Sequence, residues 1–120
     1  MATILALDDV LDAVELIKRI LERKGHTVVP FTDEEDAIKY MESHHVDLAI
    51  LDIKLKKMNG VEVLEEMKKR NSSLKVIMLT GYPTIETARE CITLGASEYC
   101  VKPIDKDEIE EKVAQVLEQG

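Results

Sequence analysis

Apolar residues fall into five short runs, separated by segments in which they recur every three or four positions. The runs are Thr3–Leu7, Thr27–Phe31, Asp47–Leu51, Leu74–Leu79 and Ser97–Val101. Four of them are nearly continuous in Ile, Leu, Val, Met and Ala, a pattern typical of parallel strands that are buried on both faces. The alternation predicts a strand–helix unit that is repeated five times, and thus an α/β fold.

The segments between the runs predict amphipathic helices, each with one apolar stripe that packs on the sheet. The clearest stripes are Val14, Ile17 and Leu21, then Ile85, Ala88 and Ile92, then Ile109, Val113, Val116 and Leu117. Thr32 and Asp105 each precede an acidic residue by three positions, which is a sequence signature of a helix N-terminus. Gly25 and Gly95 mark the expected ends of the first and fourth helices.

Pro30 lies inside the second run and has no N–H to donate to a neighbouring strand, so this strand is expected at an edge of the sheet. An edge position fits the strand order 2-1-3-4-5 of a doubly wound, flavodoxin-like sandwich with five parallel strands. In that order the crossovers are right-handed, and a ligand crevice opens at the carboxyl ends of the first and third strands. A length of 120 residues fits a single domain, 1–120.

Polar residues close four of the five runs, at the rim where this crevice is expected. They are Asp8 and Asp9, Asp52, Thr80, and Lys102. Each alone is ordinary, because an Asp pair commonly forms a turn or a helix cap. Their shared position favours a site, where clustered carboxylates would repel one another unless a divalent cation is bound or a pKa is raised. Oxygen ligands of this kind favour Mg²⁺, with Mn²⁺ as an alternative.

Asp52 is the candidate nucleophile of this site. A carboxylate can attack a phosphoryl donor and form an acyl phosphate when a metal and a cation offset the negative charge on the transferring oxygens. Lys102 can contact one phosphoryl oxygen as a point charge, and the Thr80 hydroxyl can donate a hydrogen bond to another. Gly81, beside Thr80, leaves space for the phosphoryl group.

The charge balance and the cysteines narrow the class of protein. With 16 basic and 24 acidic residues the formal net charge is −8, and direct binding to nucleic acid is not expected. Cys91 and Cys100 lack the spacing of metal ligands and are expected to be free thiols that pack as small apolar residues. The sequence shows neither a signal peptide nor an apolar stretch long enough to cross a bilayer, so we expect a cytoplasmic protein with no membrane partner.

Taken together, these motifs resemble the receiver domains of response regulators in two-component signal transduction. The resemblance extends from Thr3 to about Leu117 and rests on five motifs in the expected order. They are Leu7-Asp8-Asp9, Asp52 followed by Met58-Asn59-Gly60, Leu79-Thr80-Gly81, Gly95-Ala96 before Tyr99, and Lys102-Pro103. The set as a whole is specific, although each motif alone is weak.

The resemblance implies a role for each residue at the rim. Asp52 would accept a phosphoryl group from a histidine kinase, a phosphotransfer protein or a small donor, with help from Lys102 and Thr80. The implied Mg²⁺ ligands are Asp9 and Asp52 directly, Asp8 through water, and the backbone carbonyl of Lys54. Such a domain catalyses only its own phosphorylation and dephosphorylation, so it is a signalling domain and not an enzyme with a separate substrate.

The resemblance also implies a switch from Thr80 to Tyr99, in which the hydroxyl moves toward the phosphoryl group and the ring turns inward. The fourth helix, fifth strand and fifth helix would present the altered face to a downstream effector protein or to a covalently attached output domain. Homodimerisation through this face stays open. A cis peptide bond is expected between Lys102 and Pro103.

Three loop residues are expected to affect loop mobility and the access of water to the site. Lys56 stands where the family commonly has proline, so the loop after the acceptor is expected to be more mobile. Lys54 and Tyr82 border the phosphoryl group in the family, and their bulk here would slow the access of water unless both side chains point into solvent.

Three other functions compete with this interpretation. An aspartate-nucleophile phosphohydrolase would need an acid two residues after Asp52, where Lys54 stands, and a cap insertion that the chain lacks. A flavin binder on the same fold would need a glycine- and hydroxyl-rich phosphate loop where Asp8–Asp12 is acidic. A receiver-like interaction module that is never phosphorylated stays open, as does the question of whether the receiver stands alone or belongs to a longer regulator.

Overall fold

Five parallel strands form one sheet in the order β2-β1-β3-β4-β5, which confirms the predicted topology. The computed structural model describes residues 1–55 and 59–119, so the expected effect of Lys56 and the Met58 of the third-strand motif lie outside the described residues. The strands are β1 (Thr3–Leu7), β2 (Thr27–Phe31), β3 (Leu48–Asp52), β4 (Lys75–Thr80) and β5 (Glu98–Val101). The helices are α1 (Leu11–Glu22), α2 (Glu34–Ser43), α3 (Gly60–Arg70), α4 (Ile85–Thr93) and α5 (Lys106–Glu118).

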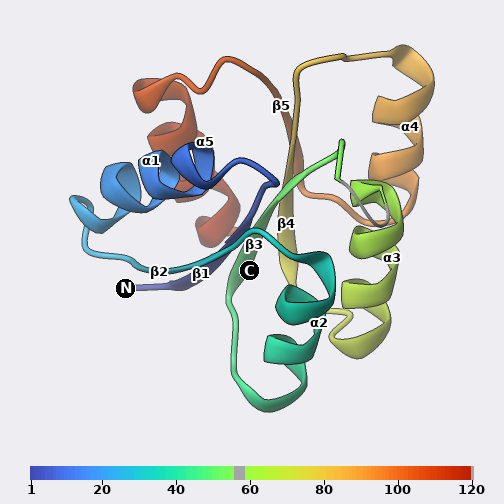
Figure 1. Ribbon diagram of the computed structural model, residues 1–120. Helices are drawn as coiled ribbons and strands as arrows, with labels where there is room; N and C mark the ends of the chain where they lie inside the picture. The colour runs from blue at the N-terminus through green and yellow to red at the C-terminus, as the bar shows by residue number, and fades with distance from the viewer. Residues whose placement is uncertain (56–58, 120) are drawn as a thin grey trace.

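The helices form two layers, one on each face of the sheet (Figure 1). Helices α1 and α5 cover one face, and α2, α3 and α4 cover the other. Alternate residues of one strand serve the two layers: in β1, Ile4 and Ala6 pack toward α1 and α5, whereas Leu5 and Leu7 pack toward α2 and α3. This two-sided burial accounts for the nearly continuous apolar runs in the sequence. No helix in the described ranges combines the length and apolarity that crossing a membrane requires.

Most of the local signals in the sequence are confirmed. Strand β2, which carries Pro30, lies at an edge of the sheet. Gly25 and Gly95 have φ values of +91° and +102°, a region that side chains strongly disfavour, and they end α1 and α4 as predicted. Asp105 caps α5 by accepting a hydrogen bond from the Glu108 amide at 3.1 Å.

The predicted cap of α2 is wrong by one residue. Asp33, not Thr32, occupies the N-cap position and accepts a hydrogen bond from the Asp36 amide at 3.0 Å. The carboxylate of Asp33 has the length and charge that suit it to the exposed amides at a helix start, so it displaces the weaker neighbouring threonine from that role.

The predicted packing of α4 is also wrong. Ile85 and Ile92 are 68% and 54% exposed, and Cys91 is the buried residue of this helix. The helix therefore turns a face of small residues toward the sheet, with Ala88 half-buried beside Cys91. Apolar spacing alone located the helix correctly but did not distinguish its inner face from its outer face.

Candidate functional site

The carboxyl ends of β1, β3, β4 and β5 bring four of the predicted site residues to one edge of the sheet. Asp8 follows β1, Asp52 and Thr80 are the last residues of β3 and β4, and Lys102 follows β5. Asp8, Asp52 and Thr80 are only 1%, 5% and 3% exposed. Burying a polar group without a partner costs free energy, so the two carboxylates at this edge need hydrogen bonds or a positive charge nearby.

Lys102 supplies the positive charge at this edge. Its Nζ lies 2.7 Å from Oδ2 of Asp8 and 3.4 Å from Oδ1 of Asp52. The backbone holds the lysine in place, because its amide donates to the Thr80 carbonyl at 2.7 Å. The bond from Lys102 to Pro103 is cis, as predicted. Burial alone would lower the pKa of Lys102, but the attraction of Asp8 and Asp52 outweighs burial and raises this pKa.

The negative charge of Asp52 is disfavoured despite the contact of this carboxylate with Lys102. Burial raises the pKa of the Asp52 carboxyl, repulsion from Asp8 and Asp9 raises it further, and Lys102 only partly opposes these effects. A second positive charge beside Asp52 would therefore stabilise its ionised carboxylate.

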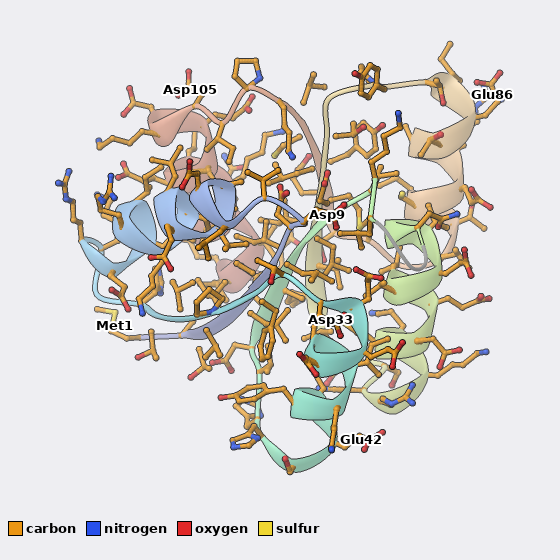
Figure 2. All side chains as sticks on the ribbon, viewed as in Figure 1. Met1, Asp9, Asp33, Glu42, Glu86 and Asp105 are labelled. Atoms are coloured by element: carbon orange, nitrogen blue, oxygen red, sulfur yellow. The ribbon has the colours of Figure 1, made fainter. Side chains whose placement is uncertain are left out.

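Asp9 lies at the end of β1, near the point where the strand ends meet (Figure 2). Its Oδ1 is buried and has no hydrogen-bond partner among the described residues, whereas Oδ1 of Asp8 accepts from the Val10 amide at 3.0 Å. A cation would satisfy this orphaned oxygen, and the carboxylate donors fit Mg²⁺. Within residues 1–55 and 59–119, no group of three or more His, Cys, Asp and Glu side chains is already arranged around a metal position.

Neutralising Asp52 is expected to stabilise the protein in the absence of divalent cations. Asp52→Asn should raise the free energy of unfolding at neutral pH by on the order of 1 kcal/mol, because it removes a buried negative charge beside Asp8 and Asp9. The folded pKa of Asp52 is raised, so its destabilising effect is absent below the unfolded pKa of about 3.9 and develops as the pH rises toward the folded value. Urea denaturation of both proteins across this pH range checks the sign.

The control for this prediction is magnesium. Addition of Mg²⁺ should narrow the difference between wild type and Asp52→Asn, because the ion would stabilise the native carboxylates preferentially. A variant that is less stable than wild type at neutral pH without Mg²⁺ would contradict the expectation.

Thr80 and Tyr99 lie close together beside the acceptor. The Thr80 Oγ1 accepts a hydrogen bond from the Tyr82 amide at 3.0 Å. The Tyr99 ring packs against the apolar layer under α4, and its hydroxyl is buried with no hydrogen-bond partner among the described residues. Burial raises the pKa of Tyr99, with smaller opposing effects from Thr84 and Thr80.

The loops that follow β3 and β4 contact each other through Lys54 and Tyr82. The Lys54 Nζ lies 4.3 Å from the centroid of the Tyr82 ring, within the range of a cation–π contact. Tyr82 is nevertheless 72% exposed, so the pair lies on the outside of the site. A Cβ at Gly81 would meet no atom within 4 Å, which agrees with the expected space beside Thr80.

Gly60 has a structural role that the pattern of apolar residues did not reveal. A Cβ at this position would lie 2.2 Å from the carbonyl oxygen of Asp52 and 2.7 Å from Cα of Ile53. The Gly60 amide donates to the Ile53 carbonyl at 2.7 Å, and Asn59 and Glu62 form a capping box. The Asn-x-x-Glu spacing was a readable signal for this helix start, whereas the close approach of α3 to the acceptor strand carried no signal beyond the glycine itself.

The sequence matches the family described as the response regulator receiver domain over residues 4–114. A solved CheY-like receiver domain from Methanospirillum hungatei JF-1 is 32% identical and superposes with a TM-score of 0.95, covering 99% of this chain and 95% of that one. The alkaline phosphatase synthesis transcriptional regulatory protein PhoP of Bacillus subtilis is 32% identical over 98% of this chain and 49% of its own length. The transcriptional regulatory protein ZraR of Klebsiella oxytoca is 30% identical over 95% of this chain and 26% of its own length.

This chain therefore spans half or less of the length of these two curated relatives. The matched residues 4–114 of this chain include the acidic pair, the Asp52 strand end and the Lys102-Pro103 motif. With the fold, the strand-end site and the sequence match in agreement, the chain belongs to the receiver-domain family of two-component response regulators.

Proposed function

We propose that the chain is a phosphoacceptor receiver in which Asp52 takes a phosphoryl group from a histidine kinase, a phosphotransfer protein or a small donor. The observation that supports this proposal most directly is the position of the Lys102 Nζ, 3.4 Å from a buried Asp52 carboxylate and 2.7 Å from Asp8. A cation held by two carboxylates can contact a phosphoryl oxygen and still keep one of its partners.

The proposed chemistry is a displacement at phosphorus. A carboxylate oxygen of Asp52 attacks the donor, the bond from phosphorus to the donor's nitrogen or oxygen breaks, and the leaving group keeps the electron pair. Lys102 stabilises charge on the transferring oxygens, and the Thr80 hydroxyl donates to one of them after it releases the Tyr82 amide. The product is an acyl phosphate on Asp52.

Mg²⁺, or Mn²⁺ in its place, is the proposed cofactor. The residues that would hold it are Asp9 and Asp52 directly, Asp8 through water, and the backbone carbonyl of Lys54. When bound, the ion would offset the negative charge that gathers on the transferring oxygens. The orphaned Oδ1 of Asp9 and the raised pKa of Asp52 support this assignment.

The test is to incubate the protein with acetyl phosphate or phosphoramidate and Mg²⁺ and to record the intact mass. We expect a phosphoryl adduct that is absent from Asp52→Ala and from a sample treated with a chelator. An adduct that survives in Asp52→Ala would show that the acceptor is another residue. A wild-type chain that accepts phosphate from no small donor and from no histidine kinase would support the alternative of an interaction module that is never phosphorylated.

The downstream role that we propose is a change of protein-interaction surface on α4, β5 and α5. Ile85 and Ile92 of α4 and Val101 of β5 are exposed apolar residues, and Val101 is 46% exposed. Tyr99 packs into the apolar layer under α4, and Thr80 ends the strand that pairs with the strand of Asp52, so a shift of either residue would reach the surface. The proposed partners are an effector protein, a covalently attached output domain, or a second copy of the chain. In this role the protein signals and does not turn over a separate substrate.

The Lys54–Tyr82 contact is expected to slow the loss of the phosphoryl group. Water must approach the acyl phosphate from the solvent side, where the two loops meet. Tyr82→Ala or Lys54→Ala should accelerate dephosphorylation about 2- to 5-fold, the equivalent of a cation–π contact of about 0.5–1 kcal/mol at an exposed site. The measurement is the decay of the phosphorylated mass after removal of the donor.

The double variant separates a shared contact from two independent obstructions. If the contact is responsible, Lys54→Ala combined with Tyr82→Ala should decay no faster than the quicker single variant. Strictly multiplicative effects would show that each side chain acts alone.

A further inference from the structure

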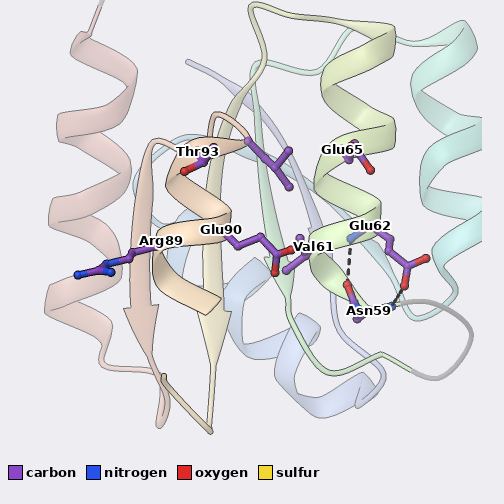
Figure 3. A pocket seen from close by; sticks show the side chains of 8 residues that line it. Asn59, Val61, Glu62, Glu65, Arg89, Glu90 and Thr93 are labelled. Carbon is purple, nitrogen blue, oxygen red and sulfur yellow. Dashed lines mark hydrogen bonds between the residues drawn. The ribbon is translucent and has the colours of Figure 1, made fainter. Parts of the chain in front are cut away.

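Helices α3 and α4 cover the face of the sheet opposite α1 and α5 (Figure 1). They line a groove whose side chains Figure 3 shows. The groove has a volume of about 360 Å³. The residues that line this α3–α4 groove include Val61, Glu62, Glu65, Arg89, Glu90 and Leu94. It lies on the α3 side of α4, away from β5 and α5, and so is distinct from the interaction surface proposed above.

The floor of the α3–α4 groove is apolar. Val61 is 8% exposed and Leu94 is half-buried, and both pack into the layer between these helices and the sheet. A partner side chain placed over them would lose apolar surface to the protein without disturbing the core.

The rim of the groove is negatively charged. Glu62 and Glu65 on α3 and Glu90 on α4 are exposed, and no hydrogen bond or ion pair joins Glu65 or Glu90 to another described residue. Figure 3 shows the Glu90 side chain directed toward Val61, whereas the guanidinium of Arg89 points away from the groove. The groove therefore offers an apolar floor beneath Glu65 and Glu90, whose carboxylates pair with no cation of residues 1–55 and 59–119.

We propose that the α3–α4 groove is a docking site for a segment of a partner protein that carries an aliphatic side chain next to a lysine or arginine. The aliphatic group would cover Val61 and Leu94, and the cation would pair with the carboxylates of the rim. The acidic rim and the net charge of −8 disfavour nucleic acid as the occupant. The groove is open along two helices, which suits an extended or helical segment.

Both walls of the groove begin at the loops of the strand-end site. Helix α3 starts at Gly60, in contact with the Asp52 and Ile53 backbone, and α4 starts just after the loop in which Tyr82 bonds to Thr80. An occupant that fixes the distance between the helices should therefore influence the acceptor, and phosphorylation should influence the occupant to the same extent. This coupling rests on the proposed function, whereas the docking itself does not.

The test of docking uses a fluorescein-labelled amphipathic peptide that presents leucine and arginine one helical turn apart. Its binding to the untreated full chain is followed by fluorescence anisotropy, and a second peptide with glutamate in place of arginine is the control. We expect saturable binding of the arginine peptide alone. The variant Glu65→Lys with Glu90→Lys should weaken it at least tenfold.

A matched variant controls for overall charge. Glu15→Lys with Glu118→Lys makes the same change in net charge at exposed positions on α1 and α5, and it should leave the affinity within about twofold of wild type. Methyl resonances of Val61 and Leu94 should shift on titration, whereas those of Leu11 on α1 should not.

Three results would overturn the proposal: no saturable binding of the arginine peptide, equal weakening in the two charge variants, or methyl shifts that avoid Val61 and Leu94. The coupling is measured on the same protein after treatment with acetyl phosphate and Mg²⁺, with the intact mass recorded. A chain that forms no adduct would count against phosphorylation by this small donor and would leave the result for docking on untreated protein unaffected.

Discussion

Lys102→Met should slow the phosphorylation of Asp52 by a small donor about 10²- to 10³-fold, the effect of removing one preorganised charge from a site where negative charge develops. Lys102 is the cation that contacts both Asp8 and Asp52, at 2.7 and 3.4 Å, and methionine keeps the apolar stem without the charge. The measurement is the initial rate of adduct formation with acetyl phosphate in saturating Mg²⁺.

Lys112 provides a closely matched control for this substitution. Its side chain is 26% exposed, as is that of Lys102, and its Nζ pairs with Glu98 at 3.2 Å, but it lies on α5 away from the acceptor. Lys112→Met should therefore keep a near wild-type rate. A wild-type rate in Lys102→Met would remove Lys102 from the proposed reaction. A loss of rate in Lys112→Met as large as that in Lys102→Met would instead point to a general loss of structure.

Gly60→Ala should lower the free energy of unfolding by about 1–3 kcal/mol, the usual range for forcing an extra group into a packed site. The added Cβ would lie 2.2 Å from the Asp52 carbonyl oxygen, and backbone cannot yield as the end of a flexible side chain can. Helix α3 would have to move away from the acceptor strand. Urea denaturation measures the change, and slower phosphorylation should accompany it.

Gly81→Ala is the matched control for Gly60→Ala. Gly81 also follows a strand of the site, but a Cβ there would meet nothing within 4 Å and its backbone does not require positive φ. Its stability should stay within about 0.5 kcal/mol of wild type. If the two alanine variants were equally stable, the close packing at Gly60 would have no energetic weight.

The sequence was sufficient for the strand order and for most of the strand-end site, because both depend on features that are local in the chain. Apolar runs located the strands within one or two residues, and Pro30 identified the edge strand correctly. Asp52 and Lys102 could be placed together in advance, because parallel strands of known order end at one edge of the sheet.

What the sequence missed depends on contacts between distant segments. The outward face of α4 is set by how the helix sits against α3 and β5, so the spacing of Ile85 and Ile92 could not reveal it. The contact of Lys54 with Tyr82 joins two loops whose paths are not encoded by any periodic pattern. The same holds for the approach of Gly60 to Asp52, which only three-dimensional packing makes visible.

The two cysteines lie in different layers of the protein. Cys91 packs among the residues of α2 and α3, whereas Cys100 packs on the opposite face of the sheet with α1 and α5. The folded chain thus cannot join them in a disulfide, and burial raises the pKa of Cys100 to about 11, so that its thiolate is scarce while the fold is closed. Thiol labelling of single-cysteine versions would then report the opening of each helical layer separately, and a difference between the two rates would show that one layer detaches without global unfolding.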